Sequence, residues 1–192
     1  MCLGEGHADC DSLPTLLTRV AAFVGREPPI LLEPIRFRRN RLLKQGELSR
    51  LLELARKKLR PPGVILIVLD TDEDCPAILG PTILGSASEA CSDVPLAVVL
   101  AKRMFESWIL AGAEGLVEQG EINPTEVPAD PEVEVRNPKQ WLSERMNRAG
   151  GYGEMADLKR LTACFSIMEA CRRARSFDKL CREVARLLTT AT

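Results

Sequence analysis

Two unbroken apolar runs limit the folds available to this chain more than any other feature of its sequence. Residues 64–69 read Val-Ile-Leu-Ile-Val-Leu, and residues 96–100 read Leu-Ala-Val-Val-Leu. A strand that is apolar at every position, rather than at alternate positions, is typical of a parallel sheet covered by helices on both faces. Helical patterns alternate with these runs, which implies crossover connections. The sequence therefore predicts an α/β fold with a mainly parallel, Rossmann-like sheet and flanking helices.

Local patterns predict further elements around these strands. Apolar residues at helical spacing follow Ser12, which is expected to cap the first helix. Residues 30–32 and 35–37 predict a short strand pair or one interrupted strand. A helix is expected over residues 78–87, broken or delayed by Gly80-Pro81.

The chain has 192 residues, and three stretches of it are expected to pack as a single domain. Residues 1–112 are expected to form the α/β core. Residues 113–137 are rich in Pro, Glu and Asp and have little periodicity, which predicts a long surface loop or lid. Residues 138–192 are expected to form a helical C-terminal part packed on the core. Three residues mark the expected helix starts there: Asn137, Ser166 and Ser176.

Composition argues against several classes of site and location. A chain of this length can bury a core without disulfides or structural zinc. Its seven cysteines contain no C-x-x-C pair, and the single histidine, His7, cannot complete a usual zinc set with them. The cysteines are therefore expected to be reduced. The N-terminus lacks a leader pattern, and the longest apolar run is far below the ~20 residues of a membrane span. We expect a cytoplasmic protein with no membrane association.

Three aspartates directly follow the first apolar run. Asp70, Asp72 and Asp74 stand at alternate positions where the predicted strand ends, and open α/β sheets bind ligands at this edge. Their charges repel one another, and Mg²⁺ or Mn²⁺ would relieve that repulsion through carboxylate ligands. One alternative is a polar loop whose Asp74 caps the next helix, and another is an aspartyl-phosphatase motif. A calcium-binding EF-hand does not fit, because Cys75 and Pro81 replace the required Gly and Glu.

A basic segment lies before these strands. Residues 36–60 carry ten Arg and Lys against two Glu. Such a segment is either a solvated helix face with a basic last turn or a surface that contacts phosphates. The second alternative makes nucleic acid a partner. Its contacts would come from four arginines: Arg36, Arg38, Arg39 and Arg41.

Two acidic motifs together resemble a known family. Glu5-Gly6 before a helix and Leu69–Asp74 after a buried strand resemble the Toprim pattern, a glutamate followed downstream by D-x-D. That fold serves topoisomerases, primases and overcoming-lysogenization-type nucleases. More closely, the chain resembles a bacterial Toprim-related family of unknown function. That family has an E-G-H-G-E start and the blocks L-D-x-D-x-D-C-P, A-x-R-E-x-E-x-W, P-K-x-W-L and S-F-D-K-L. The corresponding stretches here are residues 5–9, 69–76, 101–108, 138–142 and 176–180.

The resemblance implies a Toprim-like fold and a role for each site residue. The metal would be held by Asp70, Asp72, Asp74 and Glu106. The catalytic residues would be Glu5, as ligand or general acid/base, with Lys102 and Arg103 on phosphate oxygens. Supporting positions would be taken by Asp9 and His7, although His7 judged from its turn alone is interpreted as a hydrogen-bonding loop residue.

The resemblance further implies a Mg²⁺-dependent phosphoesterase or nuclease-like protein that acts on nucleic acid in phage defence or DNA repair, beside an ATPase. Met104 stands where relatives carry a carboxylate, Ala8 replaces a glycine, and only four residues precede Glu5, so the first strand is expected to be short. These departures leave open a noncatalytic subunit with a degenerate acidic site, whose helical C-terminal part docks a partner ATPase. Trp108 and Trp141 would lie at that interface or in the core.

Overall fold

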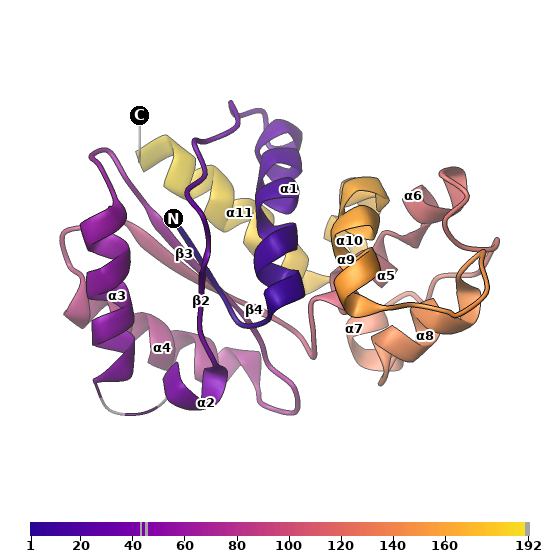
Figure 1. Ribbon diagram of the computed structural model, residues 1–192, viewed down its shortest axis with the longest axis horizontal. Helices are drawn as coiled ribbons and strands as arrows, with labels where there is room; N and C mark the ends of the chain where they lie inside the picture. The colour runs from indigo at the N-terminus through magenta and orange to yellow at the C-terminus, as the bar shows by residue number, and fades with distance from the viewer. Residues whose placement is uncertain (43, 45, 191–192) are drawn as a thin grey trace.

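The computed structural model of the chain describes residues 1–42, 44 and 46–190. Its centre is a sheet of four strands, all parallel, in the order β2-β1-β3-β4 (Figure 1). The strands are β1 (Cys2–Gly4), β2 (Ile35–Arg36), β3 (Ile65–Asp70) and β4 (Leu96–Ala101). The structure confirms an α/β fold with a parallel sheet, and both apolar runs form strands as predicted.

The first strand is short, as expected, yet it lies inside the sheet rather than at its edge. All three residues of β1 are buried. Leu3 is paired with Ile35 of β2 on one side and with Ile67 of β3 on the other. Because the four strands run in one direction, their carboxyl ends lie at one edge of the sheet. The residues that follow β1, β3 and β4 are thereby brought together.

Helices cover both faces of the sheet (Figure 1). On one face lie α3 (Glu47–Lys58) and α4 (Pro76–Ala90), and on the other lie α1 (His7–Phe23) and α11 (Arg175–Thr190). The short helix α2 (Arg39–Leu42) follows β2. This arrangement explains why β4 and residues 65–69 of β3 are apolar at every position, since helices cover both faces of these two strands.

Successive residues of β3 pack into two different cores. Ile67 belongs to an apolar cluster with Leu52 of α3, whereas Val68 belongs to a second cluster with Leu17 of α1. Side chains of a strand alternate between the two faces of a sheet, so each residue of β3 finds an apolar layer. Burial of each such side chain contributes ~1.5–3 kcal/mol to folding before the opposing loss of chain entropy.

Shorter helices extend the second cluster beyond α1 and α11. They are α5 (Glu106–Ala111), α6 (Ala113–Glu118), α7 (Pro131–Glu134), α8 (Pro138–Arg145), α9 (Glu154–Cys164) and α10 (Ile167–Arg173). Trp108, Phe165 and Phe177 are fully buried in this cluster and stack edge to face in two of their contacts. The C-terminal helices therefore share a core with the sheet.

The first helix begins earlier than the sequence predicted. It starts at His7, and Ser12, expected to be its cap, lies inside it. The Gly6 amide donates to the Asp9 carboxylate at 2.9 Å, which satisfies an N-terminal amide, and the Ser12 hydroxyl donates to the Ala8 carbonyl one turn earlier. The prediction failed because the N-cap residue is Gly6, which has no side chain to identify it as a cap.

Other segments also differ from expectation. Residues 113–137, expected as a loop or lid, contain α6 and α7 and bury Glu132. Helix α4 continues through Gly80-Pro81 without a break, and only residues 35–36 of the expected strand pair form a strand. The caps at Asn137 and Ser166 are confirmed, since their side chains accept from Gln140 and Glu169 amides.

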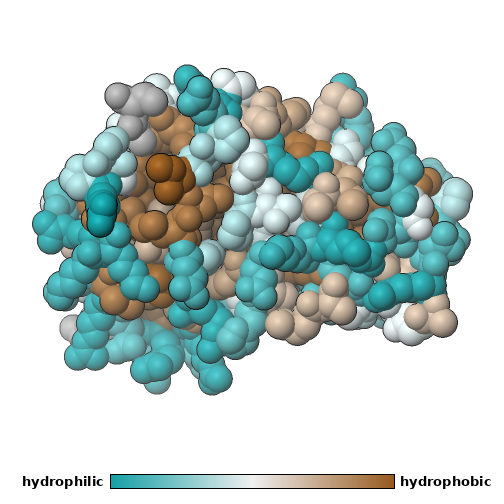
Figure 2. Space-filling model, turned by 45° about the horizontal axis from the view of Figure 1, so that its top comes forward, coloured by the Kyte–Doolittle hydropathy of each residue, from teal (hydrophilic) through white to brown (hydrophobic). Residues whose placement is uncertain are grey.

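The surface of the molecule is largely hydrophilic on the face shown in Figure 2, with apolar side chains gathered mainly over the half that contains the sheet. Within the described part of the chain, no helix has the length and apolar character to cross a bilayer. All seven cysteines are free.

Candidate functional site

Five carboxylates gather at the carboxyl edge of the sheet. Glu5 directly follows β1, Asp70 ends β3 and Asp72 lies two residues later. Asp9 stands in the first turn of α1, and Glu106 begins α5 beyond β4. We call these residues the acidic cluster. The structure thus brings together five of the residues that the sequence analysis singled out.

The loops after β3 and β4 are held against each other by backbone hydrogen bonds. The Asp72 amide donates to the Arg103 carbonyl at 2.9 Å, and the Arg103 amide donates to the buried Thr71 hydroxyl, also at 2.9 Å. Asp72 and Arg103 adopt φ of 50° and 68°, the left-handed region that costs most residues free energy. The hydrogen bonds between the two loops therefore hold Asp72 and Arg103 in backbone conformations that are unfavourable for isolated residues of these types.

Asp70 is the electrostatic centre of the acidic cluster. Burial raises its pKa well above the ordinary aspartate value, and the charges of Asp9, Glu106, Glu5 and Asp72 raise it further, in that order. None of the ion pairs in the described residues includes Asp70. An ionised carboxylate at this position is therefore costly unless a cation binds beside it.

Glu5 carries an atom with no bonding partner. Its Oε2 is buried and has no hydrogen bond within the described chain. Burial raises the pKa of Glu5, opposed by the Arg39 backbone amide and guanidinium, while Asp72 and Asp9 add to the increase. A buried carboxylate oxygen without a partner is either destabilising or reserved for a proton or ligand.

Glu106 lies on the other side of the acidic cluster, where it meets a lysine and a tyrosine. It is only 2% exposed and accepts a hydrogen bond from the Tyr152 hydroxyl at 2.8 Å. Lys139 Nζ lies 3.6 Å from it and also pairs with Glu154. Burial raises the pKa of Glu106. Burial opposes the charge on Lys139, yet Glu154 and Glu106 outweigh it and raise the Lys139 pKa.

Arg39 holds the outer aspartates. Its guanidinium pairs with Asp72 at 2.6 Å and with Asp74, while Arg103 lies 3.7 Å from Glu73. Asp74 is thus an ion-pair partner at the surface, outside the acidic cluster. Helix α4 takes Cys75, not Asp74, as its N-cap, so the capping alternative does not apply.

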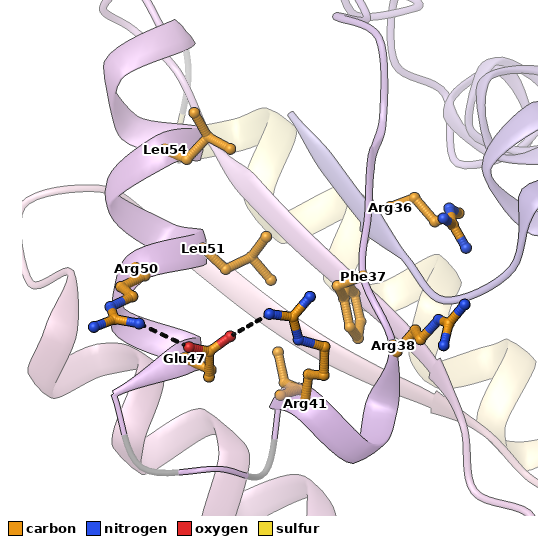
Figure 3. A pocket seen from close by; sticks show the side chains of 9 residues that line it. Arg36, Phe37, Arg38, Arg41, Glu47, Arg50, Leu51 and Leu54 are labelled. Carbon is orange, nitrogen blue, oxygen red and sulfur yellow. Dashed lines mark hydrogen bonds and ion pairs between the residues drawn. The ribbon is translucent and has the colours of Figure 1, made fainter.

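Four other arginines of the basic segment line a pocket beside β2: Arg36, Arg38, Arg41 and Arg50. In the pocket of about 310 Å³ between β2 and α3, Arg41 and Arg50 both reach Glu47, at 3.6 and 2.9 Å (Figure 3). The exposed Arg36 and Arg38 line the same pocket, but their guanidinium groups point away from Glu47 (Figure 3) and form no ion pair within the described chain. Arg36 and Arg38 stand two residues apart on the extended chain and so project to the same side of it, whereas Arg41 and Arg50 lie on α2 and α3. Within the described chain Arg36 and Arg38, like the exposed Arg60, remain available to a phosphate.

The structure does not show a preformed metal site. Among residues 1–42, 44 and 46–190, no group of three or more His, Cys, Asp and Glu side chains stands in position to hold an ion. The exposed His7 belongs to the first turn of α1. The donors in the acidic cluster are all carboxylate oxygens, and Glu5 Oε2 is unpartnered, so their chemistry fits Mg²⁺ or Mn²⁺ although they do not yet converge.

Sequence reasoning missed a buried polar junction beside Lys102. The Ser176 hydroxyl accepts from the Trp108 indole at 2.7 Å and from the Lys102 amide at 3.2 Å, and it donates to the Glu132 carboxylate. Burial raises the pKa of Glu132. Ser176 was expected to open the last helix, but α11 begins at Arg175. The junction joins residues that are distant in sequence, and no local sequence pattern predicts it.

Replacing Ser176 with alanine should lower the free energy of unfolding by roughly 2–3 kcal/mol. The substitution leaves the Trp108 indole N–H without a partner and leaves the buried Glu132 carboxylate with only the long bond from the residue 176 amide, at 3.4 Å, and each lost partner of a buried group costs about 1–3 kcal/mol. Urea unfolding measures the loss. Ser49→Ala on the exposed side of α3 is the control and should change stability by less than ~0.5 kcal/mol. Equal stability of the two variants would contradict the importance of the junction.

Comparison with protein-family models, with curated proteins and with solved structures finds no match for this chain.

Proposed function

We propose that the chain is a Mg²⁺- or Mn²⁺-dependent phosphoesterase of the nuclease type, acting on nucleic acid. The observation that carries the proposal is the acidic cluster: Asp70 lies among four other carboxylates, with a raised pKa and no ion pair in the described chain. Five carboxylates at one edge of a small domain destabilise it unless they serve a cation. The cluster also lies where parallel sheets bind their ligands.

Asp70, Asp72 and Glu5 would hold the metal, with Glu106 as a further acidic member. The ion would neutralise charge that develops on a transferred phosphoryl group. Glu5 Oε2, buried and unpartnered, is the oxygen that would hold or take a proton. Arg103, fixed by the paired loops, and the unpaired Arg36 and Arg38 would contact phosphate oxygens. The loop that carries Lys102 is positioned by Ser176.

The test is a cleavage assay on single- and double-stranded DNA, RNA and nucleotides with Mg²⁺ and with Mn²⁺. We expect metal-dependent hydrolysis of at least one class, reduced about 100-fold or more by Asp70→Asn and by Glu5→Gln. Asp178→Asn removes a carboxylate that pairs with Arg182 on α11, away from the acidic cluster, and should leave the rate unchanged. Activity that survives Asp70→Asn would overturn the assignment.

A noncatalytic subunit is the second candidate, and one observation favours it. Arg39 already pairs with Asp72 and Asp74, and the described residues contain no converged ligand set. In that case the C-terminal helices would dock a partner such as an ATPase, in phage defence or DNA repair. Trp108 and Trp141 do not support such an interface, because they are 0% and 8% exposed and belong to the core. No hydrolysis in the assay together with no cation binding would favour this alternative.

A further inference from the structure

Cys171 of α10 and Cys181 of α11 form a pair of thiols in direct contact. Their sulfur atoms lie 3.1 Å apart, and neither is in a disulfide. Cys181 is 4% exposed, whereas Cys171 is only half-buried. Cys171 is therefore the more accessible residue of the pair, and Cys181 is the covered one.

The backbone keeps the two sulfur atoms together. A single residue, Ala174, separates α10 from α11, and its amide donates to the Ala170 carbonyl at 2.9 Å. Ala174 and Phe177 are fully buried in the core, so the corner between the helices is fixed from within. Held in this way, each thiol meets the other at a high effective concentration.

The pair also differs chemically from the other cysteines. The hydrogen bond between the two sulfur atoms lowers the pKa of Cys171 and raises that of Cys181, although burial and the Asp178 charge oppose ionisation of Cys171. Burial instead raises the pKa of Cys2 and Cys10 to about 11. Reactivity follows thiolate content and access, so Cys171 combines the two properties that the buried thiols lack.

We propose that Cys171 and Cys181 are a redox-active dithiol that a hydroperoxide converts to a reversible disulfide. The Cys171 thiolate attacks the terminal peroxide oxygen, the O–O bond breaks, and the second oxygen leaves as water or an alcohol after it takes a proton. Cys171 is then a sulfenic acid. The Cys181 sulfur attacks that sulfur, an S–S bond forms, the S–O bond breaks, and water leaves. In total two thiols are oxidised by two electrons and one peroxide is reduced.

The disulfide would close a covalent loop of residues 171–181, which includes Ser176. Residues 171–181 contain the corner between α10 and α11, and Ser176 in that corner bonds to the Lys102 amide. Cross-linking the two helices restrains this corner, which is the one that positions the loop after β4. The inference does not depend on the proposed phosphoesterase activity, because it rests on the thiols alone.

The test uses the full-length reduced protein and hydrogen peroxide. We expect non-reducing peptide mapping to recover the Cys171–Cys181 cross-link as the main product, with an intact mass lower by two hydrogen atoms, and dithiothreitol to restore the starting mass. In Cys181→Ser the reaction should stop at the sulfenic acid, so a dimedone adduct should form on Cys171. Cys75→Ser removes an exposed cysteine outside the pair and should cross-link like wild type.

Three results would overturn the proposal. Peroxide that modifies Cys75 while Cys171 and Cys181 both stay reduced overturns it. A cross-link to any third cysteine as the main product also overturns it, and so does a dimedone adduct that forms in the Cys181→Ser variant elsewhere than on Cys171. If Cys181→Ser melts below room temperature, alkylation of the wild type decides: iodoacetamide should label Cys171 at least about tenfold faster than Cys181.

Discussion

Replacing Asp70 with asparagine is expected to stabilise the metal-free protein at neutral pH by ~1–2 kcal/mol and to abolish its response to magnesium. Asparagine keeps the shape of the side chain and removes a charge that burial and the neighbouring Asp9, Glu106, Glu5 and Asp72 all disfavour. Thermal melting with a chelator measures the first effect. At ten times its dissociation constant, magnesium should stabilise the wild type by about 1.4 kcal/mol, and the variant should not shift.

The pH dependence of stability gives the same prediction an independent check. The folded pKa of Asp70 is raised, so the folded chain binds a proton that the unfolded chain releases. This stabilisation is complete below the unfolded pKa of about 3.9 and is lost as pH rises through the folded value. The wild type should therefore gain stability as pH falls from that folded value toward about 3.9, by up to about 1.4 kcal/mol per pH unit for each such proton.

Glu5, Asp9 and Glu106 also have raised pKa values, so Asp70→Asn should flatten this pH slope rather than remove it. Asp178→Asn provides the control, since it deletes a carboxylate that is paired with Arg182 at 2.9 Å. If Asp70→Asn melts lower than wild type without metal, the carboxylate stabilises the fold by itself. The proposed cation site would then lose its main support.

The strands and their common edge could be predicted because the signals are local. The runs that form β3 and β4 are apolar at every position, and this pattern alone predicts strands that are covered on both faces. Parallel strands then force the residues after each strand to one edge, so Glu5 and Asp70 could be placed near each other without a structure. The proximity of Asp72 to Glu5 follows from the same rule.

The polar contacts that complete the site could not be predicted, because they join positions far apart in the chain. Lys139 reaches Glu106 from α8, and Ser176 reaches the Lys102 amide across 74 residues. Such contacts depend on how residues 113–137 fold back, and that segment has no strong periodicity. Arg39 shows the same limit, since its ion pairs with Asp72 and Asp74 cannot be distinguished by sequence from a phosphate-contacting role.

A close backbone contact between the corner of α5 and α6 and the corner of α9 and α10 depends on a glycine, and we expect Gly112→Ala to be strongly destabilising. A methyl group at Gly112 would overlap the Ser166 carbonyl oxygen and lie 2.8 Å from Phe165 Cδ2. The Ser166 amide also donates to the Gly112 carbonyl at 2.8 Å, so the two backbones cannot separate without losing that bond. We expect a loss of about 3 kcal/mol, or roughly 6–12 °C in melting temperature.

Gly85→Ala is the matched control, because it adds the same methyl group where nothing lies within 4 Å. Gly85 lies inside α4, where alanine favours the helix by about 0.5–1 kcal/mol over glycine. The two substitutions should therefore shift the melting temperature in opposite directions. If Gly112→Ala melts with wild type, the corner at residues 165–166 does not pack against Gly112 as described. A loss confined to Gly112→Ala instead shows that this backbone contact joins the corner between α5 and α6 to the corner between α9 and α10.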